Sequence, residues 1–284
     1  MRLWLAFLAL AAVVGARSDV ATPLAAVKRR HVAEAEASLH REHIGRIHRV
    51  ISMSLYGDDS DYAFGAIENA MIVRRDWPSW KLWVFHDEGI DQSTLTVLRD
   101  LGVVLHPRTA PGIKDHNPMF WRFEVAKQTN VTRFLIRDCD ARLTPRDKAA
   151  VDEWIASNQF FHVMRDHPFH GMPVMGGMWG AVGGFLPHAF FDAPRTTIIV
   201  YNDDQQKLKK YVWPFARRHA LVHDSFFCEK DDFKGTKWRP FPQQRVSKFD
   251  FVGNKYLNEN RYLGLNLTQE CPVTCRKHVE WASC

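Results

Sequence analysis

Two acidic residues separated by one cysteine follow an apolar run, and this D-x-D pattern is the strongest chemical feature of the sequence. The run from Arg133 to Ile136 is typical of a β-strand and leads, after one arginine, into Asp138, Cys139 and Asp140. In α/β proteins ligands bind at the carboxyl ends of strands, where two carboxylates can share one divalent cation. Mg²⁺ and Mn²⁺ prefer oxygen ligands and are usually shared with substrate phosphates. The three residues alone also fit a polar turn, so the neighbouring segments decide between these interpretations.

Three segments of the second half carry further candidates. The glycines around Trp179 allow close backbone approach to a ligand, with the indole as an apolar wall for a sugar ring; a bend with a core tryptophan is the alternative. Residues 202–205 (Asn-Asp-Asp-Gln) begin a predicted helix. One acidic residue is enough to cap the free N–H groups of its first turn, so the second is a candidate for a different role. His223 follows the apolar stretch 220–222, and its imidazole suits Mn²⁺ as a third protein ligand, although a hydrogen-bonded surface histidine is more common.

The elements that position these residues alternate between strands and helices. We expect strands at 49–56, 81–86, 103–106 and 133–138, with helices over 64–76, 93–101 and 120–128 between them. This alternation within about 90 residues indicates a parallel sheet with helices on both faces. The sequence contains neither G-x-G-x-x-G nor a P-loop pattern. The loop at 54–60 fits either a nucleotide contact through backbone groups or a simple turn.

Length and composition indicate a globular protein with one large domain. The chain has 284 residues, of which 46% are hydrophobic and 25% charged. The formal net charge of +6 mildly favours anionic ligands such as nucleotide phosphates. The charges are scattered and no RNA-binding aromatic motif is visible, so nucleic acid is not an expected partner.

The N-terminal segment indicates the secretory route. Arg2 precedes an apolar run from Leu3 to Gly15 that is too short to cross a bilayer comfortably. We expect a signal peptide over residues 1–16, with a mature chain from Arg17, or else a short signal anchor. Two glycosylation triplets, which begin at Asn130 and Asn266, fit that compartment.

The cysteines agree with an oxidising lumen. Cys228, Cys271, Cys275 and Cys284 can form two disulfides, which leaves Cys139 of the D-x-D as the odd thiol. Metal binding by the terminal cysteines is the competing interpretation, but their spacing lacks a convincing fourth ligand.

These segments together resemble the GT-A fold nucleotide-sugar glycosyltransferases over about residues 48–228. Among them, the strings MRDHP at 164–168 and MGGMWG at 175–180 are similar to one D-x-D-containing group. The resemblance implies an α/β, Rossmann-like, mostly parallel sheet flanked by helices. The expected organisation is a signal segment (1–16), a stem or surface helix (17–47), the catalytic domain (48–228) and a small cysteine-containing C-terminal extension (229–284).

The resemblance also implies a role for each matching residue. Asp138 and Asp140 would hold Mn²⁺ or Mg²⁺ against the donor diphosphate, with His223 completing the metal site. Asp204 and Gln205 would orient or deprotonate the acceptor hydroxyl. The expected donor-binding residues are Ser54, Tyr56, Asp87, Arg122, Gly176, Gly177 and Trp179.

The function implied is metal-dependent transfer of a sugar from a nucleotide-sugar donor to a hydroxyl of a glycan, protein or lipid. The expected location is the ER or Golgi lumen or the cell exterior, with membrane contact only if the N-terminal segment is retained. One alternative is a haloacid-dehalogenase-like phosphatase with Asp138 as nucleophile, although Arg142 stands where such enzymes have Thr or Val and three β-α units come first. Another is a non-catalytic carbohydrate-binding protein on the same fold.

Overall fold

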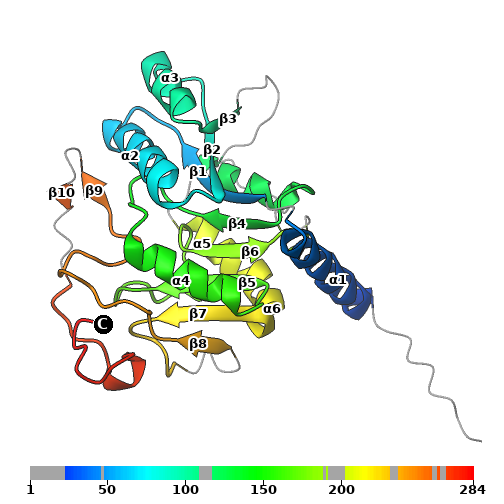
Figure 1. Cartoon of the computed structure of the whole chain (residues 1–284), viewed down its shortest axis with the longest axis vertical. Coiled ribbons are helices and arrows are strands. Elements are labelled where there is room, and N and C mark those ends of the chain that lie inside the picture. Colours follow the sequence, from blue (N-terminus) through cyan, green and yellow to red (C-terminus); the bar gives the residue numbers. More distant parts are fainter. Residues whose placement is uncertain are drawn as a thin grey trace, which may run out of the picture.

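An eight-stranded sheet organises the part of the chain that the structure describes (Figure 1). The computed structural model describes residues 23–45, 48–108, 117–187, 190, 202–230, 236–257, 261–262 and 267–284. The strand order is β3-β2-β1-β4-β6-β5-β7-β8, and every neighbouring pair is parallel except the two pairs that contain β6. The predicted α/β class with a mostly parallel sheet is confirmed.

Strands and helices alternate through the first half, as expected. The strands are β1 (Arg49–Leu55), β2 (Trp80–His86), β3 (Val104–Pro107), β4 (Arg133–Ile136), β5 (Phe161–Arg165), β6 (Trp179–Val182), β7 (Ala220–Asp224), β8 (Lys237–Arg239), β9 (Tyr256–Leu257) and β10 (Arg261–Tyr262). The α-helices are α1 (Pro23–His43), α2 (Ser60–Asp76), α3 (Gln92–Asp100), α4 (Pro145–Ala156), α5 (Asp203–Lys207) and α6 (Trp213–Ala216). Shorter helical segments are η1 (Pro118–Lys127), η3 (Leu208–Val212), η4 (Arg217–His219) and η7 (Val273–Cys275).

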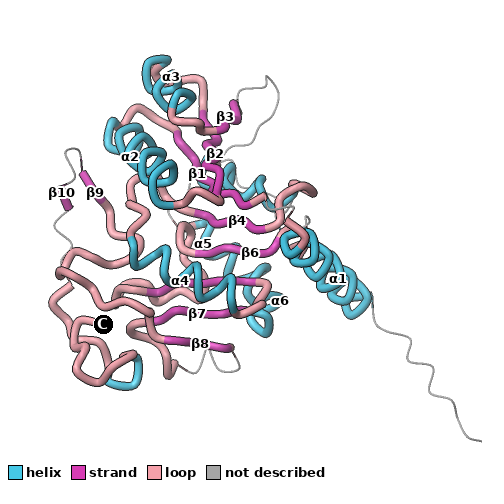
Figure 2. Tube along the Cα trace, viewed as in Figure 1, coloured by secondary structure: helices cyan, strands magenta, loops and turns pink. Residues whose placement is uncertain are grey.

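Helices cover both faces of the sheet. In Figures 1 and 2, α2 and α4 lie in front of the sheet, and α5 and α6 lie behind it. Trp154 of α4 stacks on His162 of β5, with ring centroids 5.3 Å apart, whereas the preceding residue, Phe161, packs on Trp179. Successive strand side chains point to opposite faces, so the apolar core continues on both sides. The carboxyl ends of the parallel strands meet at one edge, and that edge carries the D-x-D.

The segment around Trp179 is a strand rather than a binding loop. β6 pairs antiparallel with both β4 and β5 in the middle of the sheet. A Cβ at Gly180 would come within 2.6 Å of the Phe134 carbonyl oxygen, so this glycine serves close packing between strands. Trp179 is fully buried against Phe123, Phe134 and Phe161. The predicted sugar wall is therefore a core residue, because its strand places the indole on the covered face of the sheet.

Several expectations concern the ends of the chain. Residues 1–16 and Asn266 lie outside the described residues. The predicted stem or surface helix corresponds to α1, where His31 Nδ1 lies 2.9 Å from the Gly184 carbonyl oxygen, just past β6. Asn130 is exposed in a turn before β4. Among the described residues, no helix combines the length and apolar character needed to cross a bilayer.

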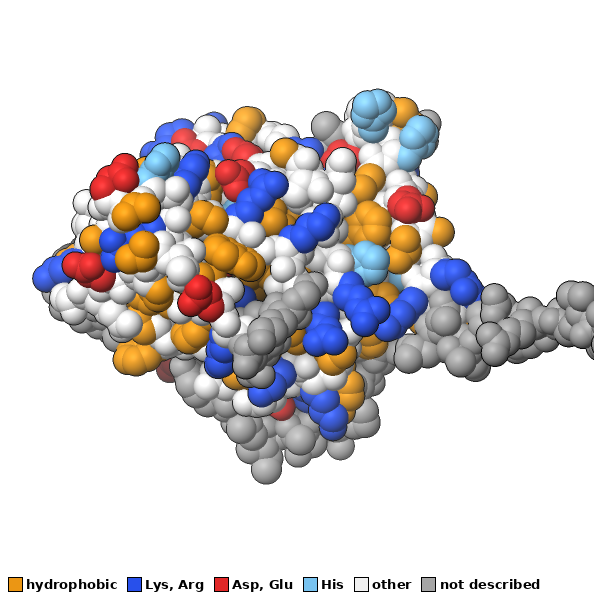
Figure 3. All heavy atoms as spheres, turned by 90° about the horizontal axis from the view of Figure 1, so that it is seen from below, with side chains coloured by type: hydrophobic (Ala, Val, Ile, Leu, Met, Phe, Trp, Pro, Cys, Tyr) orange, Lys and Arg blue, Asp and Glu red, His pale blue; other side chains and the backbone are white. Residues whose placement is uncertain are grey.

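The C-terminal segment is tied to the sheet and to itself. β8, in the segment predicted as an extension, is the edge strand of the main sheet. The predicted pair of disulfides is confirmed as Cys228–Cys275 and Cys271–Cys284, with Cys139 free and buried. On the face shown in Figure 3, basic side chains are more numerous than acidic ones, in line with the net charge of +6.

Candidate functional site

Arg122 joins two carboxylates from distant parts of the chain. It lies in η1, and its guanidinium donates to Asp138, two residues past β4, and at 3.0 Å to Asp204 of α5. Its backbone is fixed to β1, because Ser52 Oγ donates to the Arg122 carbonyl at 2.7 Å and Ser54 Oγ accepts the Arg122 N–H at 3.0 Å. Ser54 thus positions the arginine, and the arginine positions the two acids.

Burial separates the roles of the three charged groups. The side chain of Asp138 is 38% exposed, whereas those of Arg122 and Asp204 are almost completely buried. Burial alone would lower the pKa of Arg122, but Asp138 and Asp204 together raise it above its ordinary value. Burial also raises the pKa of Asp204, and Arg122 opposes that shift. Asp138 is therefore the carboxylate open to a ligand, and Asp204 is an interior group with an increased proton affinity.

Gly176 and Gly177 bring the backbone directly against these acids. A Cβ at Gly176 would overlap Asp204 Oδ2, and a Cβ at Gly177 would overlap the Asp138 carboxylate. No other residue type permits this approach, because every other side chain begins with a Cβ. The loop before β6 can therefore follow the D-x-D closely only with glycine at both positions.

The D-x-D loop rests on α2. Asn69 Nδ2 donates to the carbonyls of Cys139 (3.3 Å) and Ala141 (2.8 Å), and Asn69 Oδ1 accepts the N–H of Leu143 at 3.0 Å. Gly65 leaves room for the Cys139 carbonyl, which a Cβ would overlap. Neither Asn69 nor Gly65 was predicted from the sequence to support the site. The only indication in the sequence is an asparagine on the face of the helix that is buried. Its role depends on hydrogen-bond partners about 70 residues away in the chain.

Asp140 carries negative charge that its surroundings offset only in part. Its side chain is 17% exposed, and Lys255 Nζ lies 3.7 Å from its Oδ2. Burial, followed by the nearby Asp138, raises the pKa of Asp140 to about 6, and Lys255 acts in the opposite direction. A divalent cation bound here would favour the charged form of this buried carboxyl.

Tyr56 and Asp87 lie at the same edge of the sheet. Burial raises the pKa of the Tyr56 phenol, Arg122 opposes this, and Asp138 adds to it, so Tyr56 is close to the acidic group. Asp87 follows β2 and accepts the N–H of Gly57 at 3.1 Å, which fixes the turn after β1. Gln205 is partly exposed, and its side-chain amide donates to Asn202 at 2.8 Å.

His223 lies away from the D-x-D, contrary to the sequence-based expectation. Its Nδ1 lies 2.9 Å from His162 Nε2, and its Nε2 lies 3.1 Å from Glu153 Oε2 of α4. The alternation of β7 turns the imidazole toward α4, where burial lowers its pKa. Within the described ranges, no group of three or more His, Cys, Asp or Glu side chains is arranged to hold a metal.

The remaining donor set still fits Mg²⁺ or Mn²⁺. Asp138 and Asp140 offer oxygen atoms and both side chains reach solvent, and burial together with the neighbouring Asp138 raises the pKa of Asp140. These cations keep water ligands and are commonly completed by substrate phosphates, so two protein carboxylates are an appropriate number.

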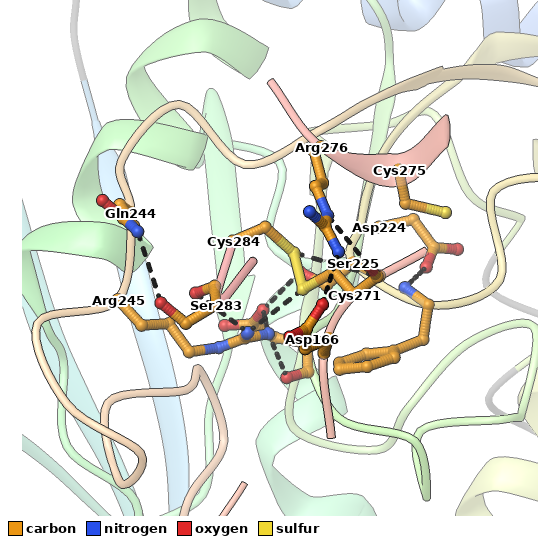
Figure 4. Close-up of a disulfide and its surroundings, with 12 residues drawn as sticks. Asp166, Asp224, Ser225, Gln244, Arg245, Cys271, Cys275, Arg276, Ser283 and Cys284 are labelled. Atoms are coloured by element: carbon orange, nitrogen blue, oxygen red, sulfur yellow. Dashed lines mark hydrogen bonds and ion pairs between the residues drawn. A yellow bond between two sulfur atoms is a disulfide. The ribbon is translucent and has the colours of Figure 1, made fainter. Parts of the chain in front are cut away.

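Two residues of the MRDHP string (residues 164–168) form buried ion pairs. Arg165 pairs with Asp224 at 2.7 Å, and Asp166 receives hydrogen bonds from Arg146, Arg245 and Ser225. In Figure 4, Arg245 and Ser225 point toward Asp166, and the Cys271–Cys284 disulfide lies beside them. Burial alone would raise the pKa of Asp166, but the two arginines hold it far below its usual value. The acid of the string, Asp166, and its arginine, Arg165, are therefore both held in buried ion pairs and have a structural role.

No protein-family profile matches the sequence, and no curated protein matches it. Solved structures with distant similarity include the mannosyltransferase PcManGT from Pyrobaculum calidifontis in complex with GDP-Man and Mn²⁺, at 10% identity and a TM-score of 0.40 over 76% of this chain and 69% of that chain. A cytidylyltransferase from Leptospira borgpetersenii is 15% identical, with a TM-score of 0.40 over 67% and 79% of the two chains. Glucosyl-3-phosphoglycerate synthase from Mycobacterium tuberculosis, in complex with Mg²⁺ and UDP, is 14% identical, with a TM-score of 0.33 over 53% and 60%. These values describe distant likenesses of shape.

Proposed function

We propose that this chain is a divalent-metal-dependent glycosyltransferase that moves a sugar from a nucleotide-sugar donor to a hydroxyl of a glycan, protein or lipid acceptor. One observation carries the proposal. At the carboxyl edge of the sheet, two solvent-reaching carboxylates, Asp138 and Asp140, lie beside Arg122, and the backbone of Gly177 approaches Asp138 with no side chain between them. Carboxylates that recruit a cation, next to a fixed guanidinium, suit a diphosphate-bearing ligand.

The proposed roles follow from exposure and contacts. Asp138 and Asp140 hold Mn²⁺ or Mg²⁺, which when bound neutralises charge on the departing nucleoside diphosphate. Arg122 contacts donor phosphate or sugar, with Tyr56 nearby on the same edge. Asp204 accepts the proton of the attacking hydroxyl, a role favoured by its raised pKa.

Four further residues are assigned roles in binding the donor or the acceptor. We assign Gln205 to acceptor orientation, because its side chain is partly exposed next to Asp204. Asp87, on the turn after β2, is assigned to the nucleoside end of the donor. Gly176 and Gly177 admit the donor by keeping side chains away from the acids.

We also propose that the protein works in the secretory pathway, in the ER or Golgi lumen or after secretion. The two disulfides support an oxidising compartment, and the apolar N-terminal run of the sequence supports entry into it. Expression in secretory cells followed by glycosidase treatment tests this: a mass shift lost on Asn130→Gln supports lumenal entry.

Calorimetric titration of UDP, GDP, CDP and ADP into the purified protein tests the function, with Mn²⁺ and with chelator. We expect one nucleotide to bind with metal and to lose affinity with chelator or in an Asp138→Asn/Asp140→Asn variant. Asp100→Asn, an exposed acid at the end of α3, is the control for a charge change alone. Failure of a folded protein to bind any of the four would contradict the proposal. A phosphate-labelled Asp138 after incubation with a phosphate monoester would instead indicate a phosphatase.

A further inference from the structure

A short segment near the C-terminus crosses the D-x-D, and we call residues 252–256 the strap. The Tyr256 N–H donates to the Asp140 carbonyl at 2.8 Å, and Lys255 forms an antiparallel bridge with Ala141. Figure 1 shows β9 and the C-terminus on the side of the sheet opposite α1, which is the edge where the D-x-D lies. The strap therefore touches the loop that carries both proposed metal ligands.

The strap is fixed at its other end as well. The Val252 N–H donates to Asp166 Oδ2 at 2.9 Å, and Val252 is buried beside Met178. Gly253 has φ +83°, and a Cβ there would come within 2.7 Å of Met178 Sδ. Asn254 is buried and donates to the Phe249 carbonyl at 2.8 Å. With both ends held, the position of Lys255 is set by the fold rather than by a loose surface loop.

Lys255 is the charged group that the strap brings to the site. Its Nζ lies 3.7 Å from Asp140 Oδ2 and 4.9 Å from the centre of the Tyr62 ring, and its side chain is 28% exposed. An ammonium has no lone pair and cannot bind a metal, but its three N–H groups suit phosphate oxygens. The ion pair with Asp140 is too long for a hydrogen bond, so the ammonium keeps N–H groups for a ligand.

We propose that Lys255 is a diphosphate-binding residue and that the strap makes the C-terminal segment part of the donor site. This inference rests on the proposed function. In the ligand-bound protein, the diphosphate lies between Arg122 on the η1 side and Lys255 on the strap side. The protein thus supplies one cation beside each carboxylate of the D-x-D, with Arg122 beside Asp138 and Lys255 beside Asp140.

Inorganic pyrophosphate with Mn²⁺ is a suitable probe, because it carries the diphosphate without any nucleoside. Calorimetry would compare wild type with Lys255→Met and Lys255→Arg. Lys237→Met removes the same charge from the exposed edge strand β8 and is the matched control. We expect Lys255→Met to weaken pyrophosphate binding by roughly tenfold or more, Lys255→Arg to stay within about threefold, and Lys237→Met to equal wild type.

The outcomes separate this inference from the proposed function. If wild type binds Mn²⁺-pyrophosphate and the selected nucleotide but Lys255→Met binds both equally well, Lys255 is only a structural ion pair and the inference fails alone. If wild type binds neither, the proposed function fails and the inference fails with it. Thermal unfolding of each variant identifies a loss of affinity that arises from a loss of fold, and the arginine variant then decides whether the positive charge matters.

Discussion

The backbone of Gly177 lies so close to the Asp138 carboxylate that a methyl group at position 177 would overlap it. Asp138 cannot move freely to make room, because Arg122 holds its other oxygen. We therefore expect Gly177→Ala to displace the carboxylate and to weaken Mn²⁺-dependent nucleotide binding by more than about tenfold, since metal sites depend on ligand position. Calorimetry with the nucleotide selected for wild type measures the effect.

Gly171→Ala is the matched control in the same loop. A Cβ at Gly171 would meet the Phe227 ring at 3.7 Å, which is an ordinary contact. This variant should bind metal and nucleotide like wild type. Equal affinities in the Gly177 and Gly171 variants would mean that Asp138 can shift without loss, and the proposed metal site would then need another ligand arrangement.

Asp204→Asn tests the proposed base. An asparagine can still accept the hydrogen bond from Arg122, which donates to Asp204 at 3.0 Å, but it cannot take a proton. We expect kcat to fall by roughly 10²- to 10⁴-fold while nucleotide affinity stays within about threefold. Steady-state kinetics and calorimetry on the same preparation measure both quantities.

The neighbouring acid supplies the control for Asp204. Asp203 pairs with Lys207 at 3.0 Å and has no proposed role in the transfer step, so Asp203→Asn should retain near wild-type kcat. A retained kcat in Asp204→Asn would remove the base assignment. A loss of nucleotide affinity without a loss of kcat would make Asp204 a positioning residue for Arg122.

The alternating strands and helices were predictable because each obeys a local rule. α4 begins where Thr144 accepts the Asp147 N–H and Pro145 starts the first turn, a cap visible in the sequence. β6 was not predictable in the same way, because its glycine is required by the Phe134 carbonyl of a neighbouring strand. Glycine in a sequence usually indicates a turn, and only the sheet order reveals the close approach of two backbones.

Residues of the candidate site could be proposed from the sequence where their chemistry is their own, and not where it depends on the direction in which a side chain points. Asp138, Arg122 and Asp204 were identified separately, and the fold joins them. His223 and Trp179 were misplaced, because both lie in strands whose facing depends on the pairing register. Nothing in the sequence around Lys255 indicates a role in the site. Its proposed role depends on the contact with Asp140, which lies 115 positions away in the chain.

Stability should fall in mild acid, and His170 accounts for part of the loss. Burial lowers the pKa of His170 to about 3, partly opposed by Asp166, and its Nδ1 accepts the Asp166 N–H at 3.1 Å. The unfolded chain therefore takes up this proton near pH 6.5 while the folded chain does not, and stability decreases as the pH falls below 6.5. Between pH 7.5 and 5.0 this group should cost about 2 kcal/mol.

His170→Asn isolates that contribution, because the amide oxygen can still accept the Asp166 N–H but does not titrate. Urea unfolding at pH 7.5 and pH 5.0 should show a smaller decrease for the variant than for wild type, by about 2 kcal/mol. Other buried histidines, including His162 and His223, titrate in both proteins and cancel in the comparison. Equal decreases would show that His170 becomes protonated in the folded protein.

The Cys271–Cys284 disulfide should hold the strap through Arg245. Arg245 Nη1 donates to Cys271 Sγ at 3.4 Å and to the Ser283 carbonyl at 3.3 Å, while Nη2 donates to the Asp166 carbonyl at 2.9 Å (Figure 4). Asp166 in turn accepts the N–H of Val252, the first residue of the strap. Loss of the disulfide should therefore loosen the strap as well as the chain end.

Cys271→Ser/Cys284→Ser should lose about 3 kcal/mol of stability, because the disulfide closes a short loop of the unfolded chain. Amide hydrogen exchange at residues 252–256 should become faster, and Mn²⁺-pyrophosphate affinity should fall. Cys228→Ser/Cys275→Ser is the control: that bridge spans 47 residues and should contribute about 4 kcal/mol, yet no hydrogen bond described for it reaches Arg245. If the control speeds exchange in the strap equally, general loss of stability explains the effect. If neither variant does, the buried Asp166 network holds the strap without help from the disulfide.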